Sequence, residues 1–171
     1  MQRPIKHAKR AKPLKIGTRG SPLALYQARL VQRLLAEEAG VEGDEIETLF
    51  PVCVFTTSGD VLSGKLSEFG GKGLFTKELE GALLAGDIDM AVHSMKDVPT
   101  RSQDGLKMAA ILKREDPRDA FISLKYGSID ELPEGAIVGT ASLRRRSQLA
   151  SFRPDIEFVL IRGNVGTRLG K

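Results

Sequence analysis

The chain has 171 residues, of which 26 are Lys or Arg, 22 are Asp or Glu and 41% are hydrophobic. This composition is typical of a globular protein and excludes collagen-like, low-complexity and disulfide-framework classes. A single cysteine, Cys53, forms no internal disulfide, and no stretch reaches the roughly 18 consecutive apolar residues of a membrane helix. Because no secretory signal pattern precedes residue 30, we expect a cytoplasmic protein with no membrane partner.

The excess positive charge lies at the N-terminus. Five Lys and Arg residues and no acidic residue occur in residues 1–13, so 21 basic residues face 22 acidic ones in the remainder. We interpret residues 1–13 as a basic, disordered tail. Binding of nucleic acid through this tail is the minor alternative, and nucleic acid is not an expected partner.

The hydrophobic pattern predicts an α/β fold in which short apolar strands alternate with amphipathic helices. Residues 14–18 are expected to form a strand, after which Ser21 and Pro22 begin a helix that Gly40 ends. Helical spacing assigns one set of side chains to its apolar face and another to its polar face. The apolar set is Leu23, Ala24, Leu30, Val31, Leu34 and Leu35, and the polar set is Arg29, Gln32, Arg33 and Glu37.

A second strand is expected within residues 46–56, interrupted near Pro51. Five glycines in residues 58–73 predict a mobile loop, which we interpret as a lid. A helix is expected over residues 75–84, closed by Gly86. Further strands are expected at 89–93, 106–112, 119–123, 136–139 and 156–161, and further helices at 142–151 and from 163.

We expect a first domain over residues 14–112, without its returning C-terminal strand, and part of a second domain over residues 113–171. The sequence stops one turn into a helix that follows a strand. It is therefore interpreted as a fragment.

Charged motifs follow several of the predicted strands, at the sheet edge where open α/β sheets bind ligands. Residues 17–22, GTRGSP, bring the Arg19 guanidinium, the Ser21 hydroxyl and helix N–H groups to a place suited to an anion, with a simple helix cap as an equal alternative. Residues 92–99, VHSMKDVP, place Lys96 beside Asp97. That carboxylate is suited to orienting an N–H donor or stabilising a cation, and a surface turn is the alternative.

Arginines also follow two later strands. Residues 139–146, GTASLRRR, put arginines in a first helical turn, where positive charge is unfavourable unless an anion binds. A solvated arginine face is the alternative. Residues 162–168, RGNVGTR, repeat the arrangement. Together with residues 17–22, these segments make three arginine-containing sites. Three such sites predict a polyanionic ligand lying across one cleft.

Other chemistries find little support in the sequence. His7, His93 and Cys53 lack the spacing of metal ligands, so no metal is expected. Cys53 lies in an apolar run, which favours a buried structural thiol over a nucleophile. Phosphate-loop and dinucleotide-binding motifs do not occur.

Six strings, from about residue 14 to residue 171, together resemble the porphobilinogen deaminase, or hydroxymethylbilane synthase, family: KIGTRGSPLALYQA, GGKGLFTKELE, DIDMAVHSMKDVPT, REDPRDAFIS, GTASLRRRSQL and RGNVGTRL. The resemblance implies a cytoplasmic, usually monomeric transferase of tetrapyrrole (haem) biosynthesis. Such an enzyme joins four porphobilinogen units head to tail and releases ammonia each time. It also implies a dipyrromethane cofactor, held by a thioether to a cysteine, and a type II periplasmic-binding-protein-like two-domain architecture followed by a third domain.

The resemblance also implies roles for individual residues. Asp97 is the expected catalytic carboxylate, which bonds pyrrole N–H groups and stabilises the cationic azafulvene left when ammonia departs. Phe75 is expected at the pocket edge, with Lys72 at the lid, and Arg146 is expected to project away from the site. The side chains expected to bind carboxylates of cofactor or substrate are Arg19, Ser21, Lys72, Ser94, Lys96, Thr140, Ser142, Arg144, Arg145, Arg162 and Arg168.

The sequence departs from the family pattern at two points. Ala141 stands where the family usually has serine. The cofactor-bearing cysteine is expected in a third domain beyond residue 171 rather than at Cys53, so the isolated chain is expected to be inactive. The alternative function is a small-anion-binding module of the same two-lobed fold. The lack of a signal pattern argues against a periplasmic receptor.

Overall fold

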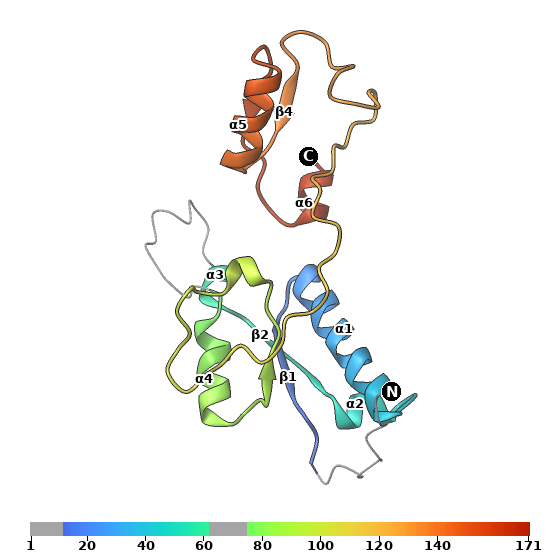
Figure 1. The fold of residues 1–171 in the computed structure, drawn as a ribbon, viewed down its shortest axis with the longest axis vertical. Helices are drawn as coiled ribbons and strands as arrows, with labels where there is room; N and C mark the ends of the chain where they lie inside the picture. The colour runs from blue at the N-terminus through green and yellow to red at the C-terminus, as the bar shows by residue number, and fades with distance from the viewer. Residues whose placement is uncertain (1–11, 62–74) are drawn as a thin grey trace. The chain divides into compact units, whose positions relative to one another are not determined.

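The computed structural model describes residues 12–61 and 75–171. The chain divides into two compact units, one ending at Ile111 and the other beginning at Leu112. The expected α/β class is confirmed, because each unit contains a parallel sheet with helices beside it (Figure 1). No helix among the described residues is long and apolar enough to span a membrane.

The first unit is built on a three-stranded parallel sheet in the order β2-β1-β3. The strands are β1 (Ile16–Arg19), β2 (Val52–Phe55) and β3 (Met90–Ala91). In the central strand, Ile16 pairs with Val52 on one side and with Met90 on the other. Parallel strands end at the same sheet edge, so this register brings Arg19 and the residues that follow β3 to one edge.

Helix α1 (Pro22–Ala39) begins and ends as the sequence predicts. The Ser21 hydroxyl accepts a hydrogen bond from the Ala24 amide at 3.4 Å, and Gly40 adopts the left-handed conformation with φ 64°. A left-handed residue favours glycine because it has no Cβ to clash with the preceding turn. Local capping chemistry therefore sets the length of this helix.

The predicted apolar face of α1 is right in part: Val31 and Leu35 pack against the core, but Leu23, Leu34 and Gln32 differ from the prediction. The buried residues of this helix are Ala28, Gln32 and Ala36, whereas Leu23 and Leu34 are exposed. The alanines form a core cluster with Ile16 and Phe50, where small side chains let helix and strand approach closely. The Gln32 side-chain amide donates to the Phe50 carbonyl at 2.7 Å, which satisfies a buried acceptor.

The segment around Pro51 is partly helical. Residues 46–49 were expected to be extended but belong to helix α2 (Glu45–Leu49), and the predicted second strand begins only at Val52. Acidic residues in the first turn of α2 favour the helix. Helix α4 (Lys77–Ala85) ends at the left-handed Gly86, φ 77°, which confirms the predicted stop. Of the expected lid, the first residues form the short helix α3 (Ser58–Val61), and residues 62–73 lie outside the described residues.

Helices α1 and α4 cover opposite faces of the first sheet (Figure 1). Successive strand residues point to opposite faces. Ile16 packs against the alanines of α1, and a Cβ built on the next residue, Gly17, would meet Leu79 of α4 and Ile88. Because helices cover both faces of the sheet, the charged residues lie at the carboxyl ends of its strands.

The second unit contains a two-stranded parallel sheet, β4 (Ile137–Gly139) beside β5 (Glu157–Val159). Each strand leads to a helix, α5 (Leu143–Phe152) or α6 (Val165–Leu169), which confirms the predicted strand and helix order. The strands expected at residues 106–112 and 119–123 are wrong, since neither segment pairs with a strand. A strand needs a ladder partner, which apolar composition alone does not supply.

Candidate active site

At the carboxyl edge of the first sheet, one carboxylate lies beside two positively charged side chains. Asp97 lies in the short 3-10 helix η2 (Met95–Asp97), a few residues after β3. Its Oδ2 is 3.7 Å from Arg19 Nη1, and its Oδ1 is 3.4 Å from Lys96 Nζ. The Arg19 and Asp97 side chains are 15% and 21% exposed, so solvent screens this pair less than a surface pair. The sequence-predicted residues of this edge therefore do lie together.

An aromatic ring flanks the same guanidinium. The Arg19 Cζ atom lies 4.1 Å from the Phe75 ring centroid, a cation–π contact. The ring also packs against Gly59 of α3, where a Cβ would overlap it. These two contacts fix Phe75 beside the Arg19 guanidinium. Lys72, the other residue expected near the lid, lies outside the described residues.

Both predicted serines of the first unit have protein partners. Ser21 caps α1, as described above. The Ser94 hydroxyl donates to Gln27 Oε1 at 2.7 Å, which joins the segment after β3 to helix α1. Gln27 was not singled out from the sequence, because 67 residues separate it from Ser94 and no local spacing connects them.

His93 lies next to these charged residues, and its own side chain is neutral. Burial lowers the pKa of its imidazole below the usual 6.5, Arg19 lowers it further, and Glu80 and Asp97 act in the opposite direction. The imidazole is therefore uncharged at neutral pH, and among the residues that the structure describes Arg19 and Lys96 are the cations that contact Asp97. Among the described residues, no three His, Cys, Asp or Glu side chains form a group able to hold a metal ion.

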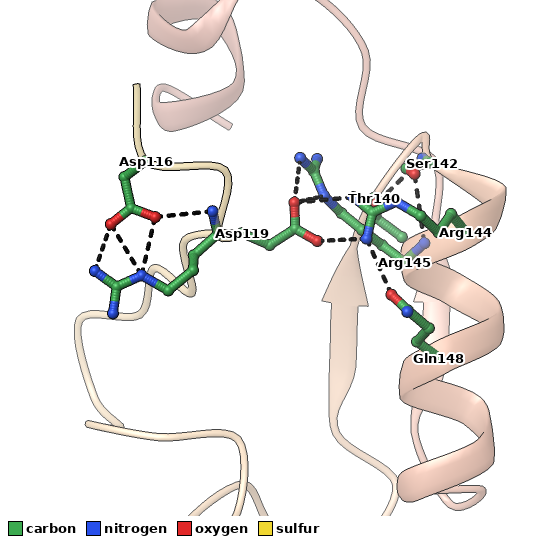
Figure 2. Close-up of polar contacts among 8 residues, drawn as sticks. Asp116, Asp119, Thr140, Ser142, Arg144, Arg145 and Gln148 are labelled. Carbon is green, nitrogen blue, oxygen red and sulfur yellow. Dashed lines mark hydrogen bonds and ion pairs between the residues drawn. The ribbon is translucent and has the colours of Figure 1, made fainter. Parts of the chain in front are cut away.

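In the second unit, two predicted arginines share one carboxylate (Figure 2). Arg144 and Arg145 lie in the first turn of α5, and both contact Asp119 of the preceding irregular segment at 2.8 Å. Hydrogen bonds from the two guanidinium groups lower the pKa of the Asp119 carboxyl to about 2. Asp119 lies within the string REDPRDAFIS but was not singled out from the sequence, where it was predicted as part of a strand rather than as a partner of this pair.

The N-terminus of α5 is capped as the sequence predicts. The Ser142 hydroxyl accepts from the Arg145 amide at 3.4 Å, and Thr140 Oγ1 accepts from the Ser142 amide at 3.2 Å. Both residues line a hollow of about 160 Å³. Arg146, which was expected to project away from the site, lines the same hollow, with its Cζ 5.7 Å from the Phe158 ring centroid.

The last predicted pair lies at the start of α6. Asn164 caps this helix, its side-chain oxygen accepting from the Thr167 amide at 2.8 Å. Arg168 Nε donates to the Asn164 carbonyl at 3.4 Å, and Arg162, which is partly buried, precedes the cap. Each unit thus carries one or more predicted arginines at or just beyond the carboxyl ends of its parallel strands.

Comparison with known proteins decides the family. The family model described as "porphobilinogen deaminase, dipyromethane cofactor binding domain" matches residues 14–171. The chain belongs to the porphobilinogen deaminase family. It is similar to the porphobilinogen deaminases of Phenylobacterium zucineum (56% identical, covering 92% of this chain and 51% of the relative), Paracoccus denitrificans (54%, covering 93% and 50%) and Caulobacter vibrioides (53%, covering 95% and 52%).

The chain spans about half the length of these porphobilinogen deaminases. Within the matched region, Cys53 is a free, partly buried thiol in β2, paired in register with Gly17. It is less buried than the sequence suggested. Nothing in its surroundings marks it as a nucleophile, since it lies on the strand itself rather than with the charged residues beyond the strand ends.

Proposed function

We propose that the whole protein is a hydroxymethylbilane synthase, which condenses four porphobilinogen molecules head to tail with release of ammonia. The observation that carries the proposal is the Arg19–Asp97 pair at the carboxyl edge of the first sheet, in a chain that matches the family over residues 14–171. Open α/β sheets bind their ligands at this edge.

Asp97 is the proposed catalytic carboxylate. Its oxygens are suited to accepting hydrogen bonds from pyrrole N–H groups and to stabilising the positive charge that develops as ammonia leaves the aminomethyl carbon. In each cycle the C–N bond of that carbon breaks, and a C–C bond forms to the free α-carbon of another pyrrole. That α-carbon then loses its proton. Arg19 and Lys96, on either side of the carboxylate, hold it in place.

The remaining predicted residues are proposed to bind acetate and propionate groups. Each pyrrole of dipyrromethane and of the substrate carries both groups, so the ligand is a polycarboxylate. Arginine is the side chain best suited to carboxylates, and Arg144 and Arg145 already bind one in Asp119. The donor set therefore fits the cofactor. When bound, dipyrromethane supplies the pyrrole carbon to which the first substrate is joined. The residues proposed to hold these groups are Arg19, Ser21, Lys72, Ser94, Lys96, Thr140, Ser142, Arg144, Arg145, Arg162 and Arg168, with Phe75 at the pocket edge.

For the two units we propose domains at residues 14–112 and 113–171, with the type II periplasmic-binding-protein-like architecture. The parallel sheet of each unit supports this assignment. We further propose that the whole protein is a cytoplasmic monomer and that its cofactor is attached to a cysteine other than Cys53.

The test is an assay of ammonia release from porphobilinogen by a chimera that joins this chain to the remaining half of the Phenylobacterium zucineum relative. The chimera should be active, and Asp97→Asn should lower its rate by about 100-fold or more. Asp104→Asn, an exposed acid of the same unit, is the matched control and should leave the rate unchanged. An inactive chimera, or equal rates for the two variants, would contradict the proposal.

A mass measurement tests the cofactor attachment separately. The 171-residue chain incubated with porphobilinogen should keep its mass of 18.6 kDa. Pyrrole-sized additions on Cys53 would show that the expected attachment site is wrong.

A further inference from the structure

Asp119 contacts one edge of each guanidinium group (Figure 2). Arg144 uses its terminal edge, with Nη1 2.8 Å from Oδ2 and Nη2 3.0 Å from Oδ1. Arg145 uses its lateral edge, with Nε and Nη2 each 2.8 Å from Oδ1. A single carboxylate thus holds two adjacent like charges side by side.

The geometry leaves a second edge on each arginine. A guanidinium has five N–H donors in a rigid plane, arranged so that two different edges each present a parallel pair. Arg144 Nη1 donates its other hydrogen to Gln148 Oε1 at 3.0 Å, so the lateral edge formed by Nε and Nη2 remains available to a ligand. Arg145 keeps its terminal Nη1 and Nη2 edge. Across residues 12–61 and 75–171, no hydrogen bond from either remaining edge is seen.

Charge favours an external carboxylate at these edges. Two guanidinium groups and one carboxylate leave one net positive charge in the first turn of α5, where the helix dipole adds to it. The arginine side chains are 58% and 39% exposed, so a ligand has access. Asp119 precedes Arg144 by 25 residues and is not part of α5, so its contact with the arginines is a tertiary one.

We propose that Asp119 is a positioning residue for carboxylate binding: by holding one edge of Arg144 and one edge of Arg145, it turns their other edges toward a carboxylate of the ligand. The inference rests on the proposed function, because it takes the ligand to be a pyrrole carboxylate. Asp119 does not itself touch the ligand. Its effect is to order two long side chains before binding, so that less conformational freedom is lost when the ligand arrives.

The first experiment needs no ligand. In NMR spectra of the 171-residue chain, the Nε–H signal of Arg145 should be protected from solvent exchange, because this group donates to Asp119. Asp119→Asn should abolish the protection, and Asp119→Glu should restore part of it. The control is Asp116→Asn, since Asp116 lies in the same irregular segment but pairs with Arg118. Backbone amide spectra show whether each variant keeps the fold. An unchanged Arg145 signal in Asp119→Asn would overturn the proposal.

The second experiment measures binding of porphobilinogen to the same chain by calorimetry. Asp119→Asn should weaken binding roughly tenfold, as expected for losing the order of two side chains, and Asp116→Asn should not. Asp119→Glu should recover part of the loss. Equal binding by Asp119→Asn and the parent would overturn the positioning role. Tighter binding by Asp119→Asn would also overturn it, since that result identifies Asp119 as a competing anion.

The arginines themselves separate this inference from the proposed function. Arg144→Ala should weaken porphobilinogen binding at least as much as Asp119→Asn. If the parent chain and Arg144→Ala bind equally, the carboxylate site assigned to this arginine is wrong, whatever the signal of Arg145 shows. If Arg144→Ala is weakened and Asp119→Asn is not, the carboxylate site holds and the positioning role fails.

Discussion

Gln32 is a buried polar side chain on α1, only 4% exposed, and its amide donates to the Phe50 carbonyl at 2.7 Å. In Gln32→Ala the carbonyl stays buried without this donor, which should lower the free energy of unfolding by about 1–3 kcal/mol. Urea denaturation measures the change. Arg33→Ala, at the exposed neighbouring position, is the control and should change stability by less than about 0.5 kcal/mol. Equal stability of Gln32→Ala and the parent would show that water or a rearranged side chain satisfies the carbonyl.

Residues that act through local chemistry, or that lie in the motifs after the predicted strands, could be predicted from the sequence, whereas Gln32 and Asp119, which act only through tertiary contacts, could not. Ser21 begins helix α1 and Gly40 ends it, each by hydrogen bonds to atoms within a few residues, so their types and spacing identify them. Gln32 meets a carbonyl 18 residues away, and Asp119 meets arginines 25 and 26 residues away. A polar residue at helical spacing is assigned to solvent unless its distant partner is known.

At the scale of elements, Ser142 has both a capping role and a proposed binding role, and two substitutions separate them. Ser142→Ala removes the side-chain acceptor for the Arg145 amide and should destabilise the second unit by about 1 kcal/mol. Ser142→Asp restores a good cap, and with it the stability, but replaces a hydroxyl donor by a negative charge that repels a ligand carboxylate. Thermal unfolding should therefore show parent-like stability for Ser142→Asp, whereas calorimetry should show weaker binding of porphobilinogen. If this variant recovers binding together with stability, Ser142 acts only through the helix.

Strand prediction failed where pairing, rather than local pattern, decides the structure. Residues 137–139 and 157–159 form strands because each pairs with the other. The apolar runs at 106–112 and 119–123 have no such partner and remain irregular. In the second of these runs, the absence of a strand leaves Asp119 in an irregular segment, where its side chain meets Arg144 and Arg145. The same misjudged element therefore hid one residue of the candidate site.

At the scale of the whole molecule, the two units differ in how much apolar surface they bury. The first unit has both faces of its sheet covered and buries Ile16, Phe50 and Leu79, whereas Ile156 is the one buried hydrophobic side chain in residues 112–171. Local opening is least costly where few apolar contacts are broken, and a two-stranded sheet has little independent stability. The amides of β4 and β5 should therefore open more readily than those of β1.

Hydrogen exchange followed by mass spectrometry measures this difference in the 171-residue chain. After division by the intrinsic exchange rate of each peptide, β1 should exchange at least roughly tenfold more slowly than β4 and β5. Ile156→Ala should accelerate exchange in β4 and β5, because the deletion leaves a cavity around the one buried hydrophobic side chain of that unit. Ile137→Ala is the matched control in the same unit, since Ile137 is 64% exposed and its removal leaves no cavity. Equal protection of the two sheets in the parent chain would mean that burial within each unit does not set its resistance to opening.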